Sequence, residues 1–160
     1  FTPKTNEVLS EESAYVVLEL LKGVTTAGSG VRLRTSAHYY KDIITGFPYE
    51  FTNPIAGKTG TTQNQTDGWF MGVVPNLATG VWTGGEDRAV HFEKIAEGQG
   101  ATMSLPTWAL FMKKVYADTT LNISQEDFEK PEYVGIDTNC GKEPVNKIKK
   151  RPPVDDDTDF

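Results

Sequence analysis

The central segment of this sequence is Ala56-Gly57-Lys58-Thr59-Gly60-Thr61-Thr62. It combines one lysine, three hydroxyl groups and two glycines, and the alternating run at 68–74 follows it closely. Period-two alternation with valine and aromatic residues predicts a strand, so we expect this stretch to lie beside a sheet. A cationic, hydroxyl-rich strand is suited to hold a carboxylate or a phosphate.

The residues around this stretch predict an antiparallel sheet. We expect strands over 55–61, 68–74 and 77–84. A polar turn at 62–66 separates the first two strands, and Pro75-Asn76 separates the last two. Connections this short imply antiparallel neighbours, because parallel strands require long crossovers.

Two amphipathic patterns predict helices. The first covers 11–22, with Ser10 as its cap and Gly23 at its end. The second covers 105–117 and accepts Pro106 because proline is tolerated in a first turn. The predicted fold class is therefore α+β, an antiparallel sheet flanked by helices.

The other segments are predicted to be less regular. We expect a surface insertion with little regular structure over 31–50, a loop over 89–103 and one helical turn over 124–128. Low apolar content and clustered charge predict a largely disordered tail over 136–160, which leaves 1–135 as the folded part.

Composition excludes several classes of protein. A net charge of −6 argues against a nucleic-acid partner, which requires a basic face. No apolar run reaches the length of a membrane-spanning helix. Two histidines and the single Cys140 disfavour a structural zinc site and an internal disulfide framework. On the strands, Trp69 and Trp82 are expected to pack, with the alternative that Trp69 borders the site, and Asp67 is expected to order the turn before it.

Three interpretations of Lys58 compete. A phosphate loop is disfavoured, because the motif requires a glycine where Thr52 stands and a helix where a strand is predicted. A purely solubilising lysine is possible, but Gly57 and Gly60 both weaken a strand and indicate close approach by a ligand. The third interpretation is that Lys-Thr-Gly is a signature of penicillin-binding proteins and class A β-lactamases.

The surrounding residues resemble class A, bifunctional penicillin-binding proteins. Pro-Ile-Ala-Gly-Lys-Thr-Gly-Thr-Thr at 54–62 and Asp-Gly-Trp-Phe-Met-Gly at 67–72 carry most of the resemblance. The other contributing segments are 21–24, 28–30, 75–77, 79–82, 84–88, 98–101 and 106–108. The resemblance implies the C-terminal part of a transpeptidase domain, with a partial β-lactamase/transpeptidase-like fold.

The resemblance also implies roles for individual residues. Lys58 would place positive charge beside the nucleophile and the terminal carboxylate of the substrate. The hydroxyls of Thr59 and Thr61 would bind that carboxylate, and the Thr61 N–H would donate to the oxyanion. Gly60 would admit the acyl group, and Thr62 would complete the substrate-binding strand. The substrate would add to the sheet edge as a further strand.

The nucleophile that the family requires is missing from this chain. The family uses Ser-x-x-Lys and Ser-x-Asn, and no serine of this sequence begins either motif. The serines tested are Ser10, Ser13, Ser29, Ser36, Ser104 and Ser124. We therefore expect the two motifs to lie upstream, and we expect this chain alone to be inactive.

The resemblance further implies partners and location. The partners would be a peptidoglycan stem peptide ending in D-Ala-D-Ala, β-lactam antibiotics and the N-terminal half of the transpeptidase domain, with no metal or organic cofactor. The parent protein would carry a glycosyltransferase domain and an N-terminal membrane anchor, and would act at the periplasmic face of the bacterial inner membrane. The alternatives are a D,D-carboxypeptidase or β-lactamase-like hydrolase, or a non-catalytic wall-binding module.

Overall fold

An antiparallel sheet organises the described part of the chain. The computed structural model describes residues 6, 8–37, 41–42 and 44–136. Its strands, β1 (Ala56–Thr61), β2 (Asp67–Val74) and β3 (Leu77–Gly84), are arranged in the order β1-β2-β3. Both neighbouring pairs are antiparallel. The three predicted strands and the predicted α+β class are therefore confirmed.

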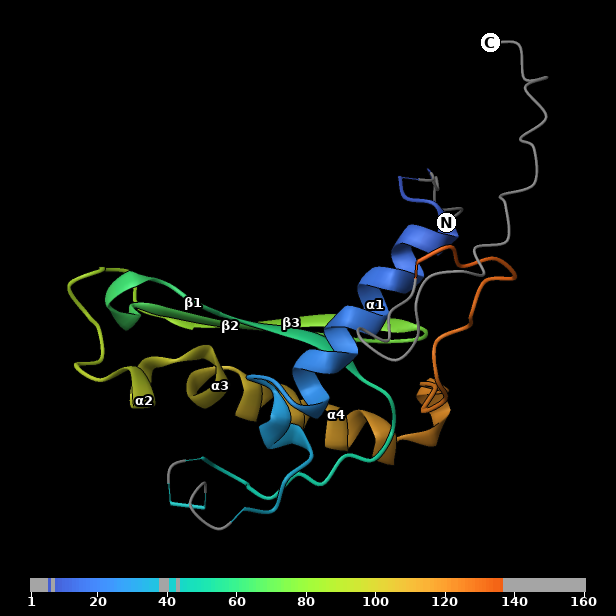
Figure 1. The fold of residues 1–160 in the computed structure, drawn as a ribbon. Coiled ribbons are helices and arrows are strands. Elements are labelled where there is room, and N and C mark those ends of the chain that lie inside the picture. Colours follow the sequence, from blue (N-terminus) through green and yellow to red (C-terminus); the bar gives the residue numbers. More distant parts are fainter. Residues whose placement is uncertain (1–5, 7, 38–40, 43, 137–160) are drawn as a thin grey trace.

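Helices flank this sheet. They are α1 (Glu11–Thr26), α2 (Ile95–Gly98), α3 (Gly100–Met103) and α4 (Leu105–Ala117). Figure 1 shows the sheet nearly edge-on, with α2, α3 and α4 along one side and α1 crossing at β1. The bounds of α4 match the predicted helix over 105–117. Short 3₁₀ turns occur at Val31–Leu33, Gln63–Gln65 and Thr119–Leu121.

The two faces of the sheet differ in burial. Phe70 and Val74 are buried on one face, whereas Trp69 and Met71 are each 45% exposed. Successive side chains of a strand point to opposite faces, so the exposed pair defines the second face. The buried face packs on α4, because the ring centroids of Phe70 and Trp108 lie 5.1 Å apart.

Trp108 is the centre of the core beneath the sheet. Its side chain is fully buried, and its Nε1 donates a 2.7 Å hydrogen bond to Thr79 Oγ1. A Cβ at Gly72 would lie 2.2 Å from Trp108 Cζ2, so the missing side chain lets the indole pack directly on the strand. The core cluster consists of Leu33, Ile44, Tyr49, Phe51, Ile55, Phe70, Val74, Leu105, Trp108, Ala109, Met112 and Val115.

The segment over 127–135, here called the C-terminal strap, returns along α1. Lys22 Nζ donates to both carboxylate oxygens of Asp127, at 2.8 and 2.9 Å. Further along the strap, Gly135 N donates a 2.6 Å hydrogen bond to Glu12 Oε1. The strap is therefore attached to α1 near both ends of that helix.

The first helix is longer than the predicted range of 11–22. The predicted end at Gly23 is wrong, because α1 continues to Thr26. A tertiary contact supports the extra turn, since Thr25 is fully buried and its hydroxyl donates a 2.6 Å hydrogen bond to Ile55 O. The last turn of α1 is thereby joined to the residue that precedes β1.

Two segments predicted to be irregular contribute more than expected. The predicted loop over 89–103 contains α2 and α3. The helix α3 packs under β1, since a Cβ at Gly100 would lie 2.3 Å from Gly60 O. The segment 31–50 has little regular structure, as predicted, but it is not confined to the surface. Three of its residues are buried in the core, namely Leu33, Ile44 and Tyr49.

Other predictions differ from the structure. The helical turn predicted over 124–128 is wrong, because the turn in this region is the 3₁₀ turn at 119–121. Trp69 and Trp82 lie opposite each other across β2 and β3, but they remain 45% and 48% exposed, so the packing expected of them is largely missing here. Of the tail predicted over 136–160, residues 137–160, which include Cys140, lie outside the described residues.

Candidate functional site

Lys58 lies on β1, which forms one edge of the sheet seen in the described residues. It stands opposite Met71, so its side chain shares the exposed face of the sheet, away from α4. Its Nζ donates a 2.7 Å hydrogen bond to Thr59 O, which holds the ammonium beside the strand. The ammonium and the edge of β1 are therefore both accessible to a ligand.

The neighbouring Thr59 faces the other side of the strand, since it stands opposite Phe70. There its Oγ1 lies 2.6 Å from Ser29 Oγ, on the loop that follows α1. Because β1 is an edge strand, a ligand lying along it can contact side chains from both faces. The structure thus places Lys58 and Thr59 on opposite faces of the same edge strand and adds Ser29, to which the sequence assigned no role.

Thr61 and Thr62 are engaged by the surrounding structure. Thr61 Oγ1 accepts a 3.0 Å hydrogen bond from Gly100 N, and this bond leaves the hydroxyl proton available. Thr62 follows the end of β1, and its Oγ1 lies 2.8 Å from Thr66 Oγ1 and 3.2 Å from the Asp67 carboxylate. Thr61 can therefore still donate to a ligand, whereas Thr62 mainly closes the turn.

Asp67 orders the turn between β1 and β2, as predicted. Its carboxylate accepts hydrogen bonds from Thr66 Oγ1 at 2.9 Å and from Trp82 Nε1 at 3.1 Å. The hydrogen bond from Thr66 lowers the pKa of the Asp67 carboxyl, with smaller contributions in the same direction from Thr62 and Trp82. The carboxylate thereby fixes both the turn after the Lys-Thr-Gly strand and the orientation of one exposed indole.

An exposed apolar surface lies on the same face as Lys58. It consists of Trp69, Met71 and Trp82, which are 45%, 45% and 48% exposed. A Cβ at Gly60 would lie 3.1 Å from Trp69 Cβ, so Trp69 borders the candidate site directly. Contiguous exposed apolar side chains of this size often mark a contact surface.

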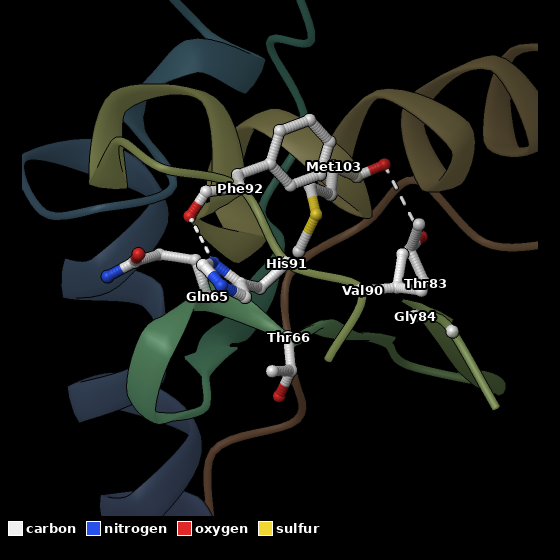
Figure 2. Close-up of a pocket in the computed structure, with 9 residues that line it drawn as sticks. Gln65, Thr66, Thr83, Gly84, Val90, His91, Phe92 and Met103 are labelled. Atoms are coloured by element: carbon white, nitrogen blue, oxygen red, sulfur yellow. Dashed lines mark hydrogen bonds between the residues drawn. The ribbon is translucent and has the colours of Figure 1, made fainter. Parts of the chain in front are cut away.

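A separate pocket lies at the end of β2 and β3 that adjoins the turn at 62–66 (Figure 2). It has a volume of about 340 Å³, and the imidazole of His91 at its edge has Nδ1 3.2 Å from Phe92 O. The residues lining it are Gln65, Thr66, Thr83, Gly84, Gly85, Val90, His91, Phe92 and Met103. No residue of the Lys-Thr-Gly strand lines this pocket, so it is distinct from the candidate site.

Among the described residues, no group of three or more His, Cys, Asp or Glu side chains is placed to hold a metal ion. Within the same part of the chain, no helix combines the length and the apolarity that crossing a bilayer requires.

Comparison with known proteins gives a consistent set of relatives. No family model matches the chain. It is 30% identical over 129 residues to penicillin-binding protein 1A of Aquifex aeolicus and 28% identical over 138 residues to that of Clostridium tetani, covering 81% and 86% of this chain. It is also 27% identical over 128 residues, 79% of this chain, to penicillin-binding protein 1A of Pseudomonas aeruginosa.

The chain spans only a small part of each relative, 15% of the first two and 13% of the third. The matches nevertheless extend over most of the chain and all carry the same name. The three-stranded sheet and its flanking helices agree with a partial transpeptidase fold. The chain therefore belongs to the class A penicillin-binding protein family, as a segment of the penicillin-binding transpeptidase region.

Proposed function

We propose that this chain supplies the carboxylate-binding strand of a peptidoglycan D,D-transpeptidase domain, which cross-links stem peptides during cell-wall synthesis. The observation that carries the proposal is the exposed edge of β1, which carries the Lys58 ammonium on one face and the Thr59 hydroxyl on the other. A stem peptide ending in D-Ala-D-Ala presents both a terminal carboxylate and an extended backbone. Edge-strand addition with a charged anchor recognises such a ligand.

The reaction divides into two acyl transfers. A serine in the part of the domain that precedes this chain attacks the amide carbon between the two D-Ala residues. The serine oxygen bonds to that carbon, the carbon–nitrogen bond breaks, and D-Ala leaves with the proton. An amine of a neighbouring stem then attacks the ester, which forms the cross-link and returns the serine hydroxyl.

The strand of this chain would act on the substrate and on the oxyanion. Lys58 would attract the terminal carboxylate, and Thr59 and Thr61 would donate hydrogen bonds to it. The Thr61 N–H would stabilise the tetrahedral oxyanion, a contribution of about 2.7–4 kcal/mol for one such donor in enzymes of comparable chemistry. β-Lactam antibiotics would acylate the same serine, because they present a similar carboxylate beside a reactive amide.

The N-terminal half of the domain would cover the exposed face. Lys58 and the apolar surface of Trp69, Met71 and Trp82 share that face. If the nucleophile lay on that face, the half-exposed indoles of Trp69 and Trp82 would become buried. The serine would then lie next to the Lys58 ammonium. The intact protein would be anchored in the bacterial inner membrane with this domain at its periplasmic face.

Lys58→Ala in the intact protein tests the proposal. Its acylation by fluorescent penicillin should slow by about 30-fold or more, because truncating one member of a desolvated charge pair costs roughly 2–5 kcal/mol. Lys114→Ala, an exposed lysine on α4, is the matched control and should label normally. Near-normal labelling of Lys58→Ala would refute the role given to this strand.

The reaction products distinguish transpeptidation from hydrolysis. With a donor stem peptide and an amine acceptor, the intact protein should form cross-linked dimers together with free D-Ala. A carboxypeptidase or β-lactamase-like enzyme would release D-Ala or open the lactam without dimers, and a wall-binding module would leave both substrates unchanged. The chain of 160 residues alone should not label, because it contains no Ser-x-x-Lys motif.

A further inference from the structure

The loop between α1 and the 3₁₀ turn at 31–33 holds Ser29 against the candidate site. Ser29 Oγ lies 2.6 Å from Thr59 Oγ1, although the two residues are far apart in the sequence. Both side chains stand at the accessible edge of β1. A short hydrogen bond between two exposed hydroxyls requires that the surrounding backbone hold them in place, since each could otherwise bind water.

The backbone around Ser29 is held tightly. Gly30 N donates to Val24 O at 2.9 Å, and Gly28 N donates to Gly23 O at 3.2 Å. A Cβ at Gly28 would lie 2.9 Å from Val24 Cα, and one at Gly30 would lie 3.2 Å from Val24 O. Glycines on both sides therefore let the loop fold closely onto the end of α1 and present the serine between them.

A buried hydrogen bond holds the start of the same loop beside β1. Thr25, in the last turn of α1, donates its hydroxyl proton to Ile55 O at 2.6 Å, and its side chain is fully buried. Ile55 directly precedes β1, so this contact fixes the end of α1 beside the start of the strand. The position of Ser29 relative to Thr59 is thus set by packing as well as by their own hydrogen bond.

The direction of the Ser29–Thr59 hydrogen bond decides what Thr59 can do. A hydroxyl has one proton to donate and two lone pairs that accept. If Thr59 donates to Ser29, its proton is used inside the protein. If Ser29 donates to Thr59, the Thr59 proton is free for a ligand. An anion at the edge of β1 accepts only, and it therefore favours the second direction.

We infer that Ser29 is a positioning residue that donates its proton to Thr59 and so directs the Thr59 hydroxyl toward the carboxylate of the substrate. This inference rests on the proposed function, since it assumes that a carboxylate occupies the edge of β1. The chain of donors runs from Ser29 to Thr59 to the carboxylate. Successive hydrogen bonds in such a chain polarise and strengthen one another.

The test compares two ligands in the intact protein, a fluorescent penicillin and its carboxylate methyl ester. Ser29→Ala should slow acylation by the penicillin about 3- to 10-fold, the range that one ordinary hydrogen bond accounts for. Acylation by the ester should change less than about twofold, because the ester carries no anion. Ser29→Thr, which keeps a hydroxyl, should restore the rate, and the exposed Ser36→Ala should match the wild type.

A double-mutant cycle shows whether Ser29 acts through Thr59. In a Thr59→Val background, Ser29→Ala should have no further effect on the penicillin. An equal loss with penicillin and ester, or a loss that persists in the Thr59→Val background, would overturn the inference while leaving the proposed function standing. Absence of labelling in the wild-type protein would instead overturn the proposed function, and the inference with it.

Discussion

Gly72→Ala should weaken the contact between the sheet and α4 severely. The new Cβ would lie 2.2 Å from Trp108 Cζ2 and 2.3 Å from its Cε2, and the indole is fully buried. Overpacking of this kind costs about 1–3 kcal/mol. If the ring moves to relieve it, the 2.7 Å hydrogen bond from its Nε1 to Thr79 is lost, which adds roughly 1–3 kcal/mol for a buried unpaired donor.

Hydrogen exchange in the intact protein measures this loss locally. A combined cost of about 2–6 kcal/mol should reduce the protection of the amides in β2 and α4 by about 30- to 20,000-fold, at tenfold per 1.4 kcal/mol. Gly80→Ala is the matched control on the exposed face. Its Cβ would meet Met71 Sδ at 2.4 Å, but that flexible side chain is 45% exposed and can move aside.

The test is the difference in hydrogen-exchange protection between Gly72→Ala and Gly80→Ala. Gly80→Ala should change protection less than about threefold, because the unbranched side chain of Met71 can change its rotamer to avoid the new Cβ, whereas the rigid indole of Trp108 cannot. If Gly72→Ala also changed the hydrogen-exchange protection less than about threefold, the Trp108 indole would have space to move that the contacts in the structure do not show. The reasoning about close packing on a bare strand backbone would then be wrong.

Two further predictions concern α1 and the C-terminal strap. Gly23→Ala should stabilise α1 by about 0.5–1 kcal/mol, because Gly23 lies inside the helix with nothing within 4 Å of its Cβ; faster exchange in α1 would contradict this. The hydrogen bonds from Lys22 lower the pKa of the Asp127 carboxyl, although partial burial opposes them. The strap should therefore stay protected from hydrogen exchange above pH 3.8, the ordinary pKa of this group, and lose protection as the pH falls through the lowered pKa. Asp127→Asn should remove that pH dependence, and an unchanged profile would show that the ion pair does not hold the strap.

Local patterns in the sequence were sufficient for the sheet and for α4. Alternation along 67–74 and short polar turns determine strand pairing, since side chains of a strand alternate between faces. The same alternation shows that Trp69 and Trp82 share a face. It does not show which face is covered, because covering depends on segments distant in the sequence. That is why their packing was predicted and their exposure was not.

Tertiary contacts explain the two errors around the site. Gly23 resembles a helix end locally, but the contact from Thr25 to Ile55 O holds a further turn in place. The four-residue helix α3 has no periodic signal of its own, because its position depends on Gly100 packing under Gly60. Contacts of this kind do not repeat along the chain, so no periodic analysis detects them.

The residues of the candidate site also fall into those that local sequence patterns predict and those that depend on tertiary contacts. The residue types of the Lys-Thr-Gly strand pointed to anion binding, and the register places Lys58 on the exposed face. The contribution of Ser29 was missed because its partner Thr59 lies on another element. The only local signal was the pair of glycines around Ser29, which predicted a loop but not what the loop contacts.

The C-terminal strap has a mechanical consequence. It is fastened to the start of α1 through Gly135 and near the end of α1 through Asp127, and the loop carrying Ser29 leaves the C-terminal end of the same helix. A load applied to the chain beyond residue 136 therefore reaches α1 before it reaches the sheet. The helix would transmit that load toward the edge of β1. A force on the strap would therefore act through α1 on the hydroxyls that face a ligand.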